Sequence, residues 1–201
     1  MLKDFWEYLR LLLAYLGKEE KEMETEEGYE AEEEVEETEK IRESENALYS
    51  RAICLLRDLE GVRSEAYTDV AGLWTIGVGH LLTKEELDTE VLQISGKKIP
   101  WRQGLSSEDI DALLRQDLIP LFAFVEKTVK VPLTPGQRIA LVSFIFNVGR
   151  GAFKGSTLLG NLNAGGYDTV PDQLYRWVYA GGKQVKGLIN RRRKEIEVWC
   201  S

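Results

Sequence analysis

Two carboxyl groups, Glu60 and Asp69, have the surroundings that catalysis would need. Their spacing alone carries little weight, because a chain with 34 acidic residues contains many pairs nine positions apart. Glu60 ends a predicted helix, where the negative end of the helix dipole disfavours a charged carboxylate. A carboxyl group that keeps its proton near neutral pH can serve as a general acid. The alternative is a helix-terminal Glu that simply pairs with an arginine.

Asp69 precedes a predicted turn over residues 70–72. If this turn has three residues, Asp69 lies opposite Leu73 and Tyr67 lies opposite Thr75. The two-residue alternation of strands then places Asp69 and Thr75 on one face of the hairpin. A carboxylate beside a hydroxyl can hold a water molecule. The alternative is ordinary turn chemistry, because Asp before a turn commonly bonds its own backbone.

The histidine and the two cysteines limit what other chemistry the chain can carry. His80 follows the string Gly77–Gly79, which lacks the third glycine and the βαβ unit of a dinucleotide site. One His and two Cys are too few for a structural zinc site, so we expect no metal. Cys54 and Cys200 are either free thiols or, after export, a disulfide joining the first and last helices. We expect Cys54 to pack among apolar helix positions.

Mostly helical elements would position these residues. An apolar stripe predicts a helix from Ser44 to Glu60, followed by Gly61 as its C-terminal glycine. Aromatic, β-branched and glycine residues over 66–80 predict a hairpin. Four more helical patterns follow: one capped by Ser107 and running to about Leu118, one between Thr134-Pro135 and Gly149, one between Thr169 and Gly181-Gly182, and one from Gly187 to Cys200. This order predicts an α+β fold.

Residues 1–46 differ in composition from the rest of the chain. Apolar residues at helical spacing over 1–17 predict an amphipathic helix. Residues 18–46 hold fifteen Glu and carry a net charge of −11, whereas residues 47–201 carry +3. A Glu-rich run of low complexity is typical of a solvated linker. We therefore predict an extension over 1–46 and a domain over 47–201, with no transmembrane segment and no cleavable signal peptide.

The order and spacing of these residues resemble the phage-type lysozymes. Glu60, Asp69 and Thr75, with the string IGVGHLLT over 76–83, resemble the T-even phage branch of that family. Two later blocks, within 137–159 and 177–192, resemble its signal-arrest-release endolysins. The three blocks follow the family order over about residues 47–201. The resemblance implies a lysozyme-like two-lobed α+β fold, with a small β-hairpin lobe and a mainly helical lobe around a saccharide cleft.

The resemblance also implies an activity and the residues that carry it. The activity is inverting hydrolysis of the β-1,4 bond between N-acetylmuramic acid and N-acetylglucosamine in bacterial peptidoglycan. Glu60 would be the general acid, Asp69 the second catalytic carboxylate, and Thr75 a ligand of the attacking water. His80 and an arginine of the last helix would support Glu60. The cleft-lining and supporting positions would be His80, Asn147, Phe153, Ser156, Thr157, Arg191 and Arg192.

The family implies no cofactor, and peptidoglycan rather than nucleic acid as the partner of a monomer. The chain would be made in the cytoplasm and would act on periplasmic peptidoglycan. One departure concerns residues 1–46, because signal-arrest-release relatives begin with a weakly hydrophobic membrane segment instead. Two alternatives stay open: a catalytically silent wall-binding protein on the same scaffold, and a lytic transglycosylase, which would not need the Asp69–Thr75 water site.

Overall fold

The computed structural model describes residues 38–69 and 72–201. The chain divides after Ala47 into two units, Met1–Ala47 and Leu48–Ser201. The amphipathic helix expected over 1–17 lies outside the described residues, as does the Glu-rich run up to residue 37. The first helix already includes residue 38, where the description begins, and continues to Glu60, so it extends at least six residues before the predicted start at Ser44. Its residues up to Ala47 are exposed, and its buried stripe begins at Leu48.

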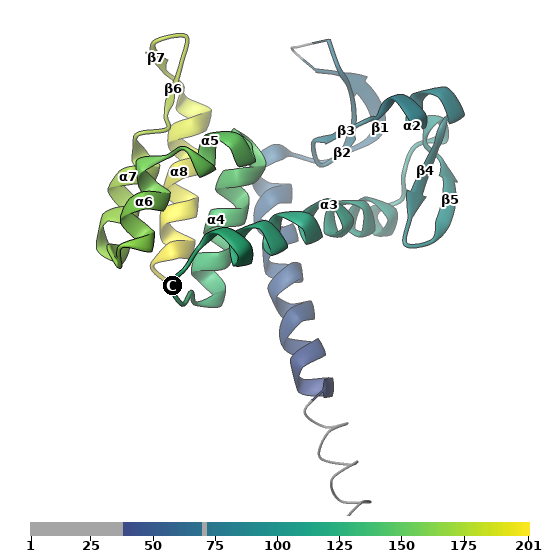
Figure 1. Cartoon of the computed structure of the whole chain (residues 1–201). Coiled ribbons are helices and arrows are strands. Elements are labelled where there is room, and N and C mark those ends of the chain that lie inside the picture. Colours follow the sequence, from purple (N-terminus) through teal and green to yellow (C-terminus); the bar gives the residue numbers. More distant parts are fainter. Residues whose placement is uncertain (1–37, 70–71) are drawn as a thin grey trace, which may run out of the picture. The chain divides into compact units, whose positions relative to one another are not determined.

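A small lobe holds a three-stranded antiparallel sheet, in the order β1-β2-β3, and a separate β4–β5 hairpin (Figure 1). Its elements are β1 (Arg63–Thr68), β2 (Trp74–Gly77), β3 (His80–Leu81), α2 (Lys84–Thr89), β4 (Val91–Ile94) and β5 (Lys97–Pro100). Tyr67 pairs with Thr75 across β1 and β2, which confirms the predicted register. The β4–β5 hairpin is an addition to the prediction. Its turn residues Ser95 and Gly96 both have positive φ, 49° and 80°, as a tight two-residue turn requires.

The long helix α3 (Ser107–Thr128) joins the small lobe to the helical lobe (Figure 1). It follows a short turn of 3-10 helix, Trp101–Gln103. The N-cap is Ser106 rather than the expected Ser107, because its hydroxyl accepts the hydrogen bond from the Asp109 amide at 3.1 Å. The helix also continues past Leu118 and through Pro120, because the apolar stripe that faces the core continues to Val125.

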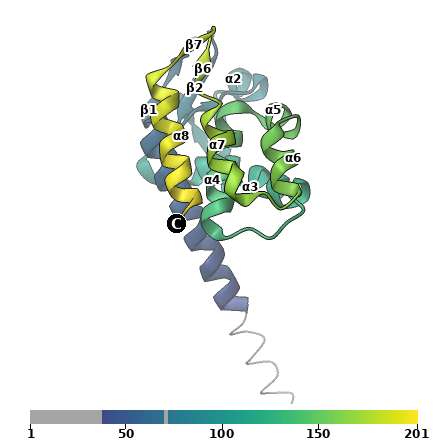
Figure 2. The same cartoon turned by 90° about the vertical axis from the view of Figure 1, so that its left-hand side faces the viewer.

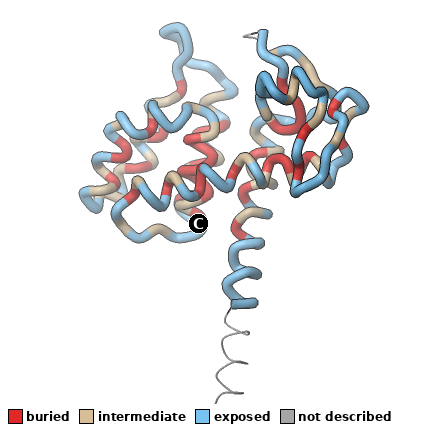
Figure 3. Tube along the Cα trace, turned by 45° about the vertical axis from the view of Figure 1, so that its right-hand side comes forward, coloured by how far each residue is buried: buried red, intermediate tan, exposed pale blue. Residues whose placement is uncertain are grey.

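The helical lobe surrounds α4, whose middle is completely buried (Figures 2 and 3). Thr134 is the N-cap, as predicted, and also forms a capping box with Gln137; Gly149 ends the helix as expected. The elements of this lobe are α4 (Pro135–Val148), α5 (Arg150–Lys154), α6 (Thr157–Asn163), a 3-10 turn (Tyr167–Thr169), α7 (Val170–Tyr175), β6 (Tyr179–Ala180), β7 (Lys183–Gln184) and α8 (Lys186–Trp199). Helices α4 and α8 pack against each other, so residues on both can meet beneath the surface.

The predicted α+β class with two lobes is confirmed. The β6–β7 hairpin of the helical lobe was not predicted, because its strands have only two residues each. Across residues 38–69 and 72–201, no helix combines the length and the apolar composition that crossing a membrane requires.

Candidate active site

Glu60 is the last residue of the helix over 38–60, and Gly61 ends that helix with φ +79°. The Gly61 amide donates to the Arg57 carbonyl at 3.0 Å, which is the bond of a helix C-terminal glycine. The chain then enters β1, so Glu60 lies where the helix meets the small lobe. Its side chain keeps 26% of its surface exposed. The acid is therefore held at a fixed point and still reaches solvent.

Arg191 of α8 is the partner of Glu60. Its Nη1 donates to Glu60 Oε1, and only 6% of its side chain is exposed. The same guanidinium donates from Nε to Glu195 Oε1 at 3.0 Å and from Nη2 to the Ser143 carbonyl at 2.8 Å. Three anchors thus fix the arginine. A guanidinium this close attracts a negative charge on Glu60, whereas the negative end of the helix repels it.

Arg192 points to other partners. Its Nη2 donates to Asn147 Oδ1 at 2.9 Å, and its guanidinium lies 4.8 Å from the centre of the Phe144 ring. The question of which arginine supports Glu60 is therefore answered by geometry: Arg191 touches Glu60, whereas Arg192 lies behind it with Glu195. Asn147 is a partner of that buried arginine.

Asp69 closes the β1–β2 turn. Its amide donates to the Leu73 carbonyl at 2.9 Å, and its Oδ1 accepts from the Leu73 amide at 2.8 Å. Tyr67 pairs with Thr75, so Asp69 and Thr75 share a face of the hairpin, as the register predicts. Thr75 is almost fully buried, and its hydroxyl donates to the Leu73 carbonyl at 3.3 Å. The turn therefore fixes both side chains, although two residues of its tip, 70 and 71, lie outside the described part.

His80 does not support Glu60, and this expectation needs correction. Its Nδ1 lies 2.8 Å from Asp117 Oδ2, and its Nε2 lies 3.4 Å from Glu86 Oε2. Burial of the ring lowers the pKa of His80, but the hydrogen bond and charge of Asp117, with Glu86, outweigh it, so the pKa is raised. His80 thus ties β3 to α3 and α2 instead of acting on the acid.

Three residues expected along the cleft have structural contacts instead. Phe153 is fully buried and packs edge-on against Phe124 and Phe144, so it belongs to the core. Ser156 is the N-cap of α6, where its hydroxyl accepts from the Leu159 amide at 3.2 Å. Thr157 remains exposed and donates to Gln173 Oε1 at 2.6 Å. Thr157 is exposed and Ser156 is half-buried, whereas a ligand could reach Phe153 only through a change of the core.

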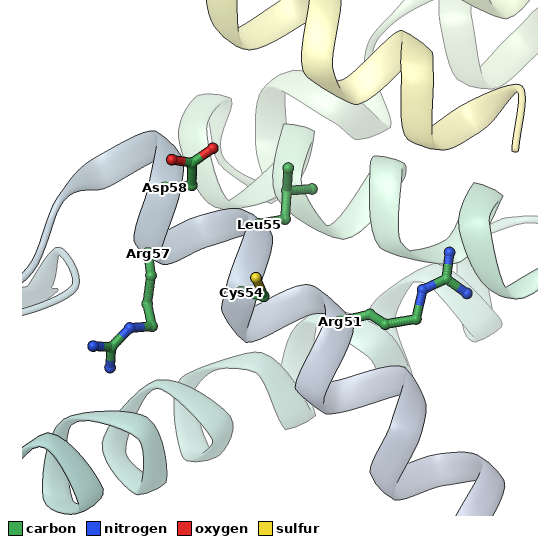
Figure 4. Close-up of a pocket in the computed structure, with 5 residues that line it drawn as sticks. All are labelled: Arg51, Cys54, Leu55, Arg57 and Asp58. Atoms are coloured by element: carbon green, nitrogen blue, oxygen red, sulfur yellow. The ribbon is translucent and has the colours of Figure 1, made fainter.

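Cys54 and Cys200 are both exposed and free. The expectation that Cys54 packs among apolar positions is therefore wrong. The helix turns it away from the stripe of Ala52 and Leu56, toward an open hollow of about 640 Å³ that Arg51 and Asp58 also line (Figure 4). Among the described residues, no group of three or more His, Cys, Asp or Glu side chains could hold a metal ion.

Four contact residues were missed from the sequence. Glu195 and Ser143 hold Arg191, and Asp117 and Glu86 hold His80. Glu195 lies on α8, where several of the buried residues are charged, so hydrophobicity alone does not reveal the buried face of the helix. Its one signal is the spacing of four and three residues from Arg191 and Arg192, which places the three on one face. Asp117 lies 37 residues from His80, and no local pattern links such a pair.

The chain is similar to several known proteins in sequence and in fold. A family model described as phage lysozyme matches residues 57–195. The SAR-endolysin of Escherichia phage Mu is 43% identical over 141 residues, which are 70% of this chain and 74% of that protein. Among solved structures, a mutant of P22 lysozyme has a TM-score of 0.63 at 34% identity, covering 76% of this chain and 97% of its own. The muramidase domain of SpmX from Asticaccaulis excentricus has a TM-score of 0.62 at 32% identity, with 75% and 95% covered.

Proposed function

The chain belongs to the phage lysozyme family, and from that premise we propose that it is an endolysin that hydrolyses peptidoglycan as an N-acetylmuramidase. The proposed substrate bond is the β-1,4 linkage between N-acetylmuramic acid and N-acetylglucosamine. One observation carries the proposal: Glu60, fixed by Arg191 at a helix end, precedes a hairpin on which Asp69 and Thr75 share one face.

Glu60 acts as the general acid in this proposal. It protonates the bridging oxygen as the glycosidic bond breaks, and the Arg191 guanidinium then stabilises the carboxylate that remains. Asp69 acts as the second carboxylate, and the Thr75 hydroxyl helps it to orient a water molecule. Attack by that water from the opposite side of the sugar inverts the anomeric centre.

A hollow of about 360 Å³ beside β3 is assigned to the saccharide path. It is lined by Gly79, His80 and Leu81 from the small lobe, and by Phe146, Gly149 and Arg150 from the helical lobe. An aromatic ring and an arginine supply the apolar and polar contacts that a sugar needs. Gly79 is suited to this wall, because it has φ +71° and a Cβ there would lie 3.4 Å from the Phe146 ring.

The Glu60→Gln variant tests the proposal. We expect it to lose clearing of Gram-negative cells with permeabilised outer membranes, because an amide is far too weak an acid to protonate the bridging oxygen. Its melting temperature should stay near that of the parent. The matched control is Glu126→Gln, which removes the same charge at an exposed carboxylate paired with Arg138 on the surface of α3. Normal clearing by Glu60→Gln would contradict the assignment.

The products test the chemistry. Mass spectrometry of the released muropeptides should show hydrated reducing ends, whereas anhydro ends would indicate a lytic transglycosylase. NMR of fresh product should show the α-anomer first, because inversion of a β-linkage gives that anomer. Binding to cell-wall sacculi without any product would indicate a silent wall-binding protein.

A further inference from the structure

Glu195 is a buried carboxylate directly behind the arginine that contacts Glu60. No part of its side chain is exposed. Its Oε1 accepts from Arg191 Nε at 3.0 Å, from Ser143 Oγ at 2.8 Å and from Arg192 Nη2 at 3.2 Å. Its Oε2 lies 2.8 Å from Arg192 Nε. A charge buried this deeply is stable only with such partners, so the cluster is a built arrangement.

The cluster bears on a difficulty in the proposed chemistry. A general acid must carry a proton, yet the Arg191 guanidinium in contact with Glu60 attracts the carboxylate that remains once that proton has left. Arg192 lies next to Arg191 on α8 and adds a second buried positive charge. Without a nearby negative charge, two guanidinium groups would act on Glu60. Glu195 is the negative charge that opposes them.

We propose that Glu195 is a positioning residue for the reaction: its carboxylate fixes Arg191 against Glu60 and offsets the charge of Arg192. One net positive charge then faces the acid instead of two. The inference rests on the proposed function, because that function assigns Glu60 as the acid. Among the described residues, Arg191 and Arg192 are the charged groups in contact with Glu195, α4 contributes the neutral Ser143, and Glu60 acts through Arg191.

The two members of the buried pair depend on each other electrostatically. Burial raises the pKa of Glu195, and the two arginines with the Ser143 hydrogen bond act against that rise. Burial also lowers the pKa of Arg192, to about 10, although Glu195 acts in the opposite direction. Each charge is therefore costly to keep without the other, and a variant that removes one of them changes the field at Arg191 and Glu60.

Glu195→Gln is the first test, because the amide keeps the size of the side chain and removes its charge. With two arginines unopposed, the donor loses its proton at lower pH. We expect the basic limb of the kcat/KM profile against pH, measured on purified peptidoglycan, to move down by about one pH unit. At neutral pH kcat should fall more than KM changes. The control Glu126→Gln should leave the profile unmoved, because that carboxylate is exposed and pairs with Arg138.

Arg192→Met, alone and combined with Glu195→Gln, separates electrostatics from packing. Alone, it leaves Glu195 opposing Arg191, so the basic limb should move to higher pH. The double variant restores a single positive charge and should return the limb toward its parent position. Neutral replacement of a buried ion pair is often tolerated, and the Arg192 Nη1 already lacks a hydrogen-bond partner among the described residues.

The inference is supported if the basic limb of the kcat/KM profile moves in opposite directions in the two single variants and returns toward the parent in the double variant. A purely structural role would change the melting temperature and leave this pH profile unchanged. If the parent is active and Glu195→Gln has the same pH profile as the parent, the inference fails and the proposed function stands. The same holds for a double variant that keeps the Glu195→Gln profile. A parent that cleaves no glycan overturns the proposed function, and the inference with it.

Discussion

The ring of His80 lies between two carboxylates, one on α3 and one on α2. Its side chain is 12% exposed and that of Asp117 25%, so solvent screens the pair only in part. Because Asp117 and Glu86 outweigh the effect of burial, the pKa of His80 is higher in the folded chain than its ordinary value of 6.5. The charged ring therefore stabilises the fold.

The His80 contacts predict how stability depends on pH. A group with a raised folded pKa stabilises fully below its unfolded pKa, and this contribution disappears as the pH rises through the folded value. We expect the free energy of unfolding to fall by on the order of 1 kcal/mol as the pH rises from just below 6.5 through the raised pKa of His80 in the folded chain. Thermal unfolding across this range should show a smaller decline in Asp117→Asn. An equal decline in both proteins would contradict the assignment.

Phe153 illustrates a residue whose role changes once its packing is known. Its ring is fully buried against Phe124 and Phe144. Truncation to Ala should therefore cost about 3–5 kcal/mol of stability, because it leaves a cavity in the core. Urea unfolding measures this loss. The KM for glycan at a temperature where the variant is folded should remain close to that of the parent, and a selective rise in KM with little loss of stability would restore the cleft-lining interpretation.

At the scale of elements, the prediction succeeded where a local signal fixes the backbone. Gly61 and Thr134-Pro135 marked helix ends because their conformational preferences need no distant partner. The β1–β2 register followed from one assumed turn length. The β4–β5 hairpin was missed, although Ser95-Gly96 between short alternating runs was a usable signal. The end of α3 was placed too early, at about Leu118, because the apolar stripe that faces the core continues to Val125 and carries the helix through Pro120.

The turn between β2 and β3 gives a prediction at the element scale. Gly79 has φ +71°, and an added Cβ would lie 3.4 Å from the Phe146 ring. Gly79→Ala should therefore lower stability by about 1–2 kcal/mol, because an L-residue is strained in the left-handed region. The matched control is Gly151→Ala in α5, where φ is not positive and nothing lies within 4 Å of the added Cβ. Denaturant unfolding should show a loss in the first variant only.

At the scale of the whole molecule, the chemistry depends on residues that come together only through the fold. Arg191 reaches Glu60 across 131 positions of sequence, and Ser143 joins them from a third helix. The family pattern supplied Glu60, Asp69 and Thr75, whose mutual placement depends on one helix end and one hairpin. It did not supply Glu195 or the true partner of His80, because side-chain contacts between distant elements leave no periodic pattern in the sequence.

The division of the chain after Ala47 predicts that residues 1–46 can be removed without loss of the fold or of catalysis. The hydrophobic core begins at Leu48, and the family match begins at residue 57. The shortened protein should unfold within about 0.5 kcal/mol of the full chain. Its net charge changes from −8 to +3, so it should release reducing ends from anionic walls faster at low salt. Added salt should remove this advantage, because it screens the attraction.

A variant that lacks only residues 1–37 is the control for this truncation, since it keeps the exposed start of the helix over 38–60. Residues 38–46 hold three Glu against Lys40 and Arg42, a net charge of −1, so this variant carries +2. If the acidic residues act through charge alone, its rate at low salt should lie close to that of the shorter protein and above that of the full chain. All three proteins should then converge as salt increases. A loss of activity that salt does not reverse would instead make residues 1–46 part of the catalytic unit.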